Sequence, residues 1–384
     1  MGDKADEPHR GDRPRRNGAT NGAANGHAEG GCWHWPGGAG VKRINVALQG
    51  GGAHGAFAWG VLDRLLEDPR IEIEAVSGTS AGAMNAVVAA HGLKIGGPAK
   101  ARERLEAFWR RVSVEAIASP IKRSLPDMLF SNWNLDHNPV LALVDMAIRV
   151  VSPYQFNPLN LNPLRDILVS EVDFEAVRSC SCMRLFIAAT NVLTGSGRVF
   201  SGEEITADAV MASACVPYLF QAVEIDGEPY WDGGYMGNPV LEPFLTKCCA
   251  QDVVLVQVNP FHRQSTPKTA REILDREHEI AFNAALLHEL RHIDFVNRCL
   301  EQGELSRWGL RPIFLHAVSG GEEFAKLAAS SKLNAEWMFL THLRDMGRRA
   351  AGQWLAASFA DIGVRSTMDL TAFRHAPLHV PARV

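Results

Sequence analysis

The chain has 384 residues, of which 46% are hydrophobic and 21% are charged. This length suggests one large domain or two modest ones, and the apolar content is sufficient for a core, which excludes a chain that is disordered throughout. The 39 basic and 43 acidic residues give a net charge of -4. A near balance of this kind argues against a nucleic-acid binder, which would carry a basic excess.

Residues 1–40 are rich in glycine and poor in apolar side chains, so we expect a disordered tail. No stretch is long and apolar enough to cross a bilayer, and the N-terminus lacks the apolar segment of a signal peptide. The seven cysteines are an odd number, which excludes a fully paired disulfide framework and favours a reducing compartment. We therefore expect a cytoplasmic protein that can contact a membrane surface without crossing it. We interpret Cys180, Cys182, Cys248 and Cys249 as small buried hydrophobic residues.

Two strand–turn–helix units open the ordered part of the chain. Residues 43–48 and 71–76 are rich in Ile and Val and predict strands. Each is followed by a glycine-containing turn and a helical pattern, at 56–66 and at 81–91. Repetition of strand, turn and helix is typical of a parallel sheet in the α/β class.

The rest of the chain alternates between the same two kinds of element. Further strands are expected at 184–190, 198–200, 223–225, 229–231, 253–258 and 313–318, and further helices at 103–112, 140–151, 206–214, 271–300 and 336–359. We divide the chain into the tail at 1–40, a main domain at 41–300, and a C-terminal strand and helical extension at 301–384 that packs on the same domain.

A serine lies in the second of these turns. The run Gly78-Thr79-Ser80-Ala81-Gly82 fits the pattern G-x-S-x-G, between a predicted strand and a predicted helix. The glycines permit a sharp, strained turn that exposes the serine hydroxyl at the carboxyl edge of the sheet. The simpler alternative is an ordinary turn in which Ser80 caps the helix.

A glycine run, Gly50-Gly51-Gly52-Ala53-His54-Gly55, follows the first strand. Its spacing also occurs in dinucleotide-binding folds, but the next strand ends in Val76-Ser77-Gly78 and lacks the carboxylate that would hold a ribose. It is not a P-loop either, because no Lys-Ser or Lys-Thr pair follows. We interpret it as an oxyanion-binding loop at a helix N-terminus. The expected donors are the backbone N–H groups of Gly50, Gly51, Gly52 and Ala53.

A third motif is Asp232-Gly233-Gly234, which follows a short predicted strand. It can be an ordinary turn, because Asp-Gly is common turn chemistry. Alternatively, the strand end holds a carboxylate that acts as general base for Ser80. Two apolar runs, Tyr218–Phe220 and Met128–Phe130, are assigned to the core rather than to an acyl channel.

A fourth motif points to a different chemistry. His288-Glu289-Leu290-Arg291-His292 fits H-E-x-x-H within a predicted helix, which would place both histidines on one face as a zinc site requires. No third ligand is evident nearby. We therefore favour a helix that carries two solvent-exposed histidines, and we keep a zinc metalloprotease using His288, Glu289 and His292 as the alternative of another class.

Taken in order, the first three motifs resemble the patatin-like phospholipases. In that family the loop reads G-G-G-x-basic-G, which is matched at 50–55 with His54 in the basic position. The serine motif is matched at 78–82 and Asp-Gly-Gly at 232–234. Residues 212–217 and Asn238-Pro239 are also similar to the family, and the resemblance covers about residues 42–260.

The resemblance implies a three-layer sandwich with a mainly parallel central sheet flanked by helices, and a catalytic domain at 41–300. It implies hydrolysis of fatty acyl esters of lipids with Ser80 as nucleophile and Asp232 as its partner, without a metal or an organic cofactor. The supporting motif residues are then His54, Gly55, Gly78, Gly82, Gly233 and Gly234. An esterase or an intracellular polyester (polyhydroxyalkanoate) depolymerase with the same dyad is the alternative, as is a non-catalytic module that binds a lipid or an anion.

Overall fold

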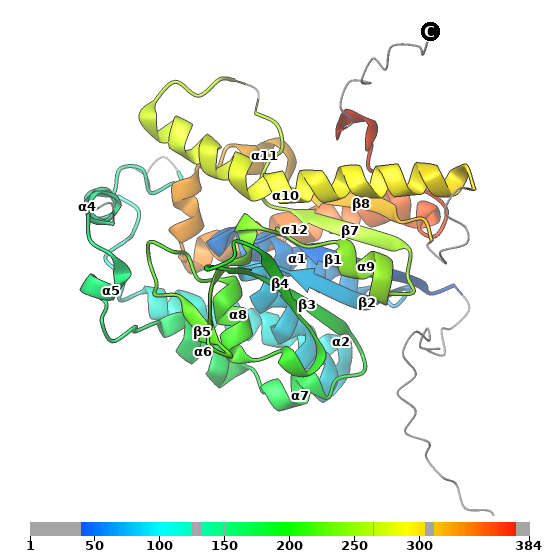
Figure 1. Ribbon diagram of the computed structural model, residues 1–384, viewed down its shortest axis with the longest axis horizontal. Helices are drawn as coiled ribbons and strands as arrows, with labels where there is room; N and C mark the ends of the chain where they lie inside the picture. Colours follow the sequence, from blue (N-terminus) through cyan, green and yellow to red (C-terminus); the bar gives the residue numbers. More distant parts are fainter. Residues whose placement is uncertain are drawn as a thin grey trace, which may run out of the picture. The chain divides into compact units, whose positions relative to one another are not determined.

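The computed structural model describes residues 40–124, 127, 132–148, 150–263, 265–303 and 311–373. The predicted tail, up to residue 39, and Met128–Phe130 lie outside them. Within the described chain, eight strands form one sheet in the order β5-β6-β3-β2-β1-β7-β8, with β4 paired to β3 (Figure 1). The strands are β1 (Lys42–Leu48), β2 (Ile71–Gly78), β3 (Arg184–Asn191), β4 (Gly197–Phe200), β5 (Val223–Ile225), β6 (Glu228–Asp232), β7 (Asp252–Gln257) and β8 (Phe314–Ser319).

The central part of the sheet is parallel. β1 pairs in parallel with β2 and β7, β2 with β3, and β7 with β8, whereas β4, β5 and β6 form antiparallel pairs. Leu48 at the end of β1 is level with Gly78 of β2 and Val256 of β7. The turns that follow these three strands therefore begin at the same edge of the sheet.

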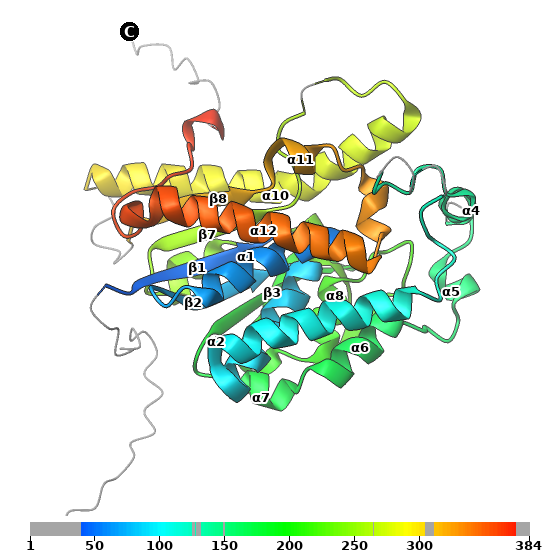
Figure 2. The ribbon, with the colours of Figure 1, turned by 180° about the vertical axis from the view of Figure 1, so that it is seen from behind.

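Helices cover both faces of the sheet, and Figure 2 shows α1, α2 and α12 together on one of them. Ile44, Val46 and Leu48 of β1 join the apolar cluster on that face, whereas Ala47 joins the cluster beneath α9 and α10. These observations confirm the expected three-layer α/β sandwich. The helices are α1 (Gly55–Glu67), α2 (Ala81–Ala116), α4 (Pro139–Ala147), α5 (Pro153–Phe156), α6 (Pro163–Glu171), α7 (Phe174–Arg178), α8 (Ala207–Ser213), α9 (Glu242–Lys247), α10 (Ala270–Glu301), α11 (Gly321–Ala325) and α12 (Trp337–Ser358).

Some local predictions differ from the structure. The helices expected at 81–91 and 103–112 belong to one element, α2, which is interrupted by non-helical backbone at Gly96 and Gly97. Cys180 and Cys182 form a disulfide and are half-buried, so their assignment as buried hydrophobic residues was wrong. Cys248 is a buried free thiol, as expected. None of the described helices combines the length and apolar character that crossing a membrane would require.

Candidate active site

Ser80 lies in a strained turn between β2 and α2. Its φ of 56° and ψ of -123° define a conformation that residues other than glycine rarely adopt. A Cβ atom on Gly82 would lie 2.4 Å from the carbonyl oxygen of Leu48, so only glycine lets α2 begin this close to β1. The Ser80 side chain makes no capping hydrogen bond, which contradicts the ordinary helix-cap alternative. The backbone N–H of Ser80 instead donates to Ser213 Oγ over 2.9 Å.

Asp232 lies at the end of β6 and faces this serine. Its backbone N–H donates to the carbonyl of Cys215 over 2.8 Å, and its carbonyl accepts a 2.9 Å hydrogen bond from Thr190 Oγ1. The side-chain Oδ1 accepts from the N–H of Gly234 over 2.7 Å, and the Ser80 side chain lies near enough to the carboxyl to lower its pKa. The structure thus brings the serine and aspartate motifs together.

Burial controls the protonation of Asp232, whose exposed fraction is only 2%. Loss of hydration raises the pKa of this carboxyl to about 6, although the hydrogen bonds from Gly234 and Ser80 and the charge of Lys332 act in the opposite direction. The group is therefore largely ionised at neutral pH and more basic than an exposed aspartate. This is the behaviour required of a general base that works near pH 7.

The glycine run forms a short 3-10 helix (Gly52–His54) that leads directly into α1. In the part of the chain that the structure describes, the N–H groups of Gly51 and Gly52 donate to no protein atom, as is usual for the first groups of a helix. Gly50 behaves differently, because its N–H donates to Asn238 Oδ1 over 2.6 Å. Its inclusion among the oxyanion donors was therefore wrong. A Cβ atom on Gly50 would lie 2.7 Å from Ser80 Cβ, so the loop lies directly beside the serine.

Buried amide side chains hold the glycine loop in place, and sequence reasoning did not assign them this role. Gln49 Oε1 accepts from the N–H groups of Val258 and Asn259 over 2.8 and 2.9 Å. Its Nε2 donates to the carbonyl of Asn238 and to Asn283 Oδ1, each over 3.2 Å. Asn259 Nδ2 donates to the carbonyl of Gly50 over 3.0 Å. A detectable signal was the Asn-Pro pair at 259–260, which follows the buried strand β7 at the same edge as the loop.

His54, in the basic position of the loop, is buried, with an exposed fraction of 3%. Its Nε2 is 2.7 Å from Ser331 Oγ, and its ring packs edge-on against Phe324 with a centroid distance of 4.9 Å. Burial, followed by the charge of Lys332, lowers the pKa of His54 well below its ordinary value. The imidazole is therefore neutral and carries no positive charge in the site.

The H-E-x-x-H segment forms the middle of α10 and has another role. His288 and His292 are exposed, whereas Glu289 turns inward and accepts hydrogen bonds from the N–H groups of Leu241 and Glu242 at the start of α9. Across the described residues, no group of three His, Cys, Asp or Glu side chains is arranged to hold a metal ion. The exposed-histidine interpretation is thus confirmed, and the zinc-protease alternative lacks its required geometry.

A model of the patatin-like phospholipase family matches residues 46–245, just over half of the chain. This chain belongs to the patatin-like phospholipase family. Family membership implies that the protein is a lipid acyl hydrolase, and the matched region includes Ser80, Asp232 and the glycine loop. A comparison with curated proteins by sequence finds no significant match.

Solved structures of low sequence identity are similar to this patatin-like chain. VipD from Legionella pneumophila is 15% identical, with a TM-score of 0.33, and the match covers 80% of this chain and 67% of VipD. ExoU from Pseudomonas aeruginosa, solved in complex with SpcU, is 14% identical, with a TM-score of 0.34. That match covers 83% of this chain and 52% of ExoU, so this chain spans about half the length of ExoU.

Proposed function

We propose that this patatin-like protein cleaves fatty acyl esters of lipids, with Ser80 as nucleophile and Asp232 as general base. The proximity of Ser80 to the buried carboxylate of Asp232, beside N–H groups at 51–52 that donate to none of the described protein atoms, carries the proposal. A serine needs an adjacent base to become a nucleophile at neutral pH, and the raised pKa of Asp232 makes it a stronger base. No histidine is required for this proton transfer.

In the first step, Ser80 Oγ attacks the ester carbonyl carbon while its proton moves to Asp232. The carbonyl oxygen becomes an oxyanion, which the N–H groups of Gly51 and Gly52 stabilise together with the helix dipole of α1. The tetrahedral intermediate then collapses. The bond to the alcohol breaks, Asp232 returns the proton to the leaving alkoxide, and the acyl group remains on Ser80.

In the second step, water replaces the alcohol. Asp232 accepts a proton from the water, whose oxygen attacks the acyl carbon of the acyl-enzyme. Collapse of the second tetrahedral intermediate releases the fatty acid and returns the proton to Ser80 Oγ. The same carboxylate thus serves both half-reactions, which fits its pKa of about 6 because it has to gain and lose a proton in each.

A mainly apolar cavity of about 720 Å³ next to Asp232 supports a fatty acyl substrate. Thr190 and Tyr235 in its wall lie close to Asp232. Thr190 Oγ1 donates to the backbone carbonyl of Asp232, and burial followed by the charge of Asp232 raises the pKa of Tyr235. Tyr218 is exposed and lines the same cavity, so its assignment to the core was wrong. This volume falls in the range of ordinary small-molecule sites.

The segment from α4 to residue 161 supports contact with a lipid surface. It borders the acyl cavity through Val151 and Tyr154, and it lies at the side of the molecule where the parallel strands end (Figures 1 and 2). Residues 139–161 contain only two side chains that are charged at neutral pH, Asp145 and Arg149. The exposed apolar side chains are Leu143, Met146, Val150, Val151, Tyr154, Phe156, Leu159 and Leu161. Exposed apolar patches of this kind mark interaction sites, and the near lack of charge favours neutral or zwitterionic lipid over anionic lipid.

Labelling with a fluorophosphonate tests the catalytic assignment. We expect one adduct on the wild-type protein, located at Ser80 by peptide mass, and none on Ser80→Ala. A chelator should leave the labelling unchanged. An adduct on another serine, or the absence of any adduct, would contradict the assignment.

The substrate class requires a separate measurement. We expect hydrolysis of a short-chain ester to increase once its concentration exceeds the critical micelle concentration, because the surface at 139–161 then binds the aggregate. A double variant, Val150→Ser with Leu159→Ser, should lose this increase and retain its rate on monomeric ester. An unchanged profile for the variant would favour a soluble ester or a polyester as the substrate.

A further inference from the structure

Lys332 contacts the site from a part of the chain that lies beyond the family match. It lies in the 3-10 helix Ala329–Leu333, and its Nζ donates to Asn259 Oδ1 over 2.7 Å. Asn259 in turn donates through Nδ2 to the carbonyl of Gly50, over 3.0 Å. The ammonium group, the amide and the glycine loop therefore form one continuous series of hydrogen bonds.

The backbone around Lys332 also packs against the glycine loop. Gly52 has a φ of 57°, and a Cβ atom there would lie 2.5 Å from the carbonyl oxygen of Lys332. Ser331 Oγ is 2.7 Å from His54 Nε2. These two contacts fix the position of the helical turn from which the lysine side chain extends. His54, in the basic position of the loop, thus helps to hold the helical turn from which the charged Lys332 side chain extends.

Several charged groups face the ammonium of Lys332. Burial lowers the pKa of Lys332. Glu279 and Asp275 of α10 and Asp232 at the end of β6 act in the opposite direction because they attract the ammonium, whereas Arg263 repels it. His54 is neutral, because burial and then the charge of Lys332 lower its pKa. Glu279 is already paired with Arg263 and Arg276. Asp232 is the one carboxylate of these three that contacts the serine.

We propose that Lys332 is a positioning residue of the acyl-transfer site, which supports the glycine loop through Asn259 and supplies beside Asp232 the positive charge that His54 lacks. This inference rests on the proposed function of Ser80 and Asp232. The lysine contacts neither the serine nor the reacting ester, so it acts through these two neighbours. Its charge lowers the pKa of Asp232 and thereby keeps the base ionised in mildly acidic solution.

Removal of the charge therefore has a pH-dependent consequence. If the Asp232 pKa rises by roughly one unit from about 6, the ionised fraction falls about fivefold at pH 6 and by less than about 1.2-fold at pH 8. Loss of packing or of the hydrogen bond to Asn259, by contrast, slows the reaction by the same factor at every pH. The two effects are separable in one pH profile.

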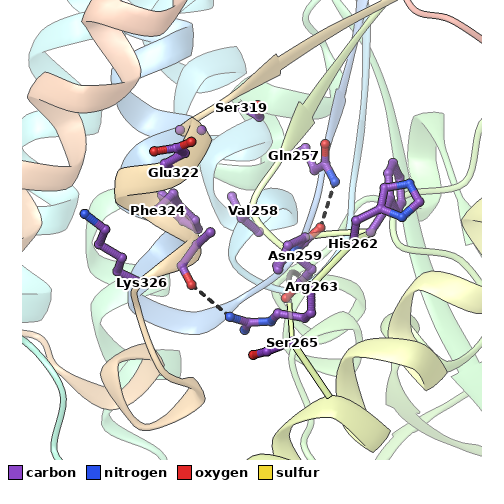
Figure 3. A pocket seen from close by; sticks show the side chains of 15 residues that line it. Gln257, Val258, Asn259, His262, Arg263, Ser265, Ser319, Glu322, Phe324 and Lys326 are labelled. Atoms are coloured by element: carbon purple, nitrogen blue, oxygen red, sulfur yellow. Dashed lines mark hydrogen bonds between the residues drawn. The ribbon is translucent and has the colours of Figure 1, made fainter. Parts of the chain in front are cut away.

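The experiment measures the rate of fluorophosphonate labelling of Ser80 between pH 5 and 9 in the full chain. Lys332→Met removes both the charge and the hydrogen bond, Lys332→Gln retains a donor for Asn259 without the charge, and Lys332→Arg retains the charge. Lys326→Met is the matched control. That lysine is exposed in the same C-terminal segment, and in Figure 3 its side chain points away from Asn259 across a pocket of about 650 Å³.

We expect Lys332→Met and Lys332→Gln to label about fivefold more slowly than the wild type at pH 6, relative to the ratio at pH 8. Lys332→Arg and Lys326→Met should retain the wild-type midpoint. If Lys332→Met does not fold, as judged by thermal unfolding, Lys332→Gln carries the same test. A midpoint that does not move in the charge-free variants overturns this inference but leaves the Ser80 assignment intact. A wild type without an adduct on Ser80 overturns both.

Discussion

Asp232 and Glu289 are two carboxyl groups in similar environments with different neighbours. Both accept backbone N–H hydrogen bonds, and burial raises the pKa of Asp232 to about 6 and that of Glu289 to about 7. Asp232 lies at the carboxyl edge of the sheet and contacts Ser80, whereas Glu289 lies in a helix and contacts the start of α9. A raised pKa therefore indicates burial, and the group beside the carboxyl determines its role.

Substitution of each carboxyl by its amide gives the largest expected difference. Asp232→Asn removes the base and should lower the rate of ester hydrolysis by about 10³-fold or more. Glu289→Gln should remain within about twofold of the wild type, because both backbone donors reach one oxygen, Oε2, and an amide oxygen can replace it. The measurement is kcat/KM on a soluble ester. A large loss of kcat/KM in Glu289→Gln, with unchanged folding, would contradict the different roles that we assign to Asp232 and Glu289.

The glycine loop belongs to the same site as Asp232, and Gly52→Ala tests its role in the reaction. The added Cβ would lie 2.5 Å from the carbonyl oxygen of Lys332. A residue other than glycine is also strained at a φ of 57°, so the loop has to move. Loss of one oxyanion donor typically lowers the rate about 10²- to 10³-fold, and we expect about 10² here. Gly363→Ala is the control, because it has a φ of 78° with no atom within 4 Å of the added Cβ. Equal rates for the two variants would argue against an oxyanion role for the loop.

The pH dependence of kcat/KM also distinguishes Asp232 from Glu289, and the expected change in rate is smaller than for the substitutions above. The pKa of Asp232 is about 6, so the ionised base and hence kcat/KM should increase as the pH rises through 6. Between pH 5 and pH 7 the increase should be about tenfold. Glu289→Gln should leave this midpoint in place, even though the pKa of Glu289 lies within one unit of that of Asp232. A midpoint that moves with Glu289→Gln would mean that Glu289 controls the reaction.

The long, apolar elements of the fold were predictable from the sequence, and the short polar ones were not. The strand predicted at 184–190 is β3 (Arg184–Asn191), and the helix predicted at 271–300 is α10 (Ala270–Glu301). Helices α6 and α7 were missed because each has fewer than ten residues and too few apolar positions to show a period. Their starts carry capping residues, Asn162 before a proline and Asp173, which were the available signal.

The candidate site was predictable only where its residues follow strands. Ser80 and Asp232 are found by local motifs, because a strand end and a glycine turn are encoded together in a few residues. Lys332 has no such motif, since it approaches the glycine loop through tertiary packing. The error at Gly50 has a related cause, because Asn238, 188 residues away, accepts the hydrogen bond of its N–H.

A further expected effect concerns stability and involves Glu289. Its pKa is raised in the folded protein, from 4.5 to about 7, so between these values the unfolded chain loses its proton while the folded chain retains it. Glu289 therefore lowers the free energy of unfolding as the pH rises from 4.5 to 7, and Glu289→Gln abolishes that decrease. Relative to the wild type, the variant should gain on the order of 2 kcal/mol between pH 5 and pH 8 in urea unfolding. A carboxylate at a helix N-terminus can instead be stabilising. A variant that loses stability relative to the wild type at pH 8 would show that this attraction to α9 outweighs the cost of burial.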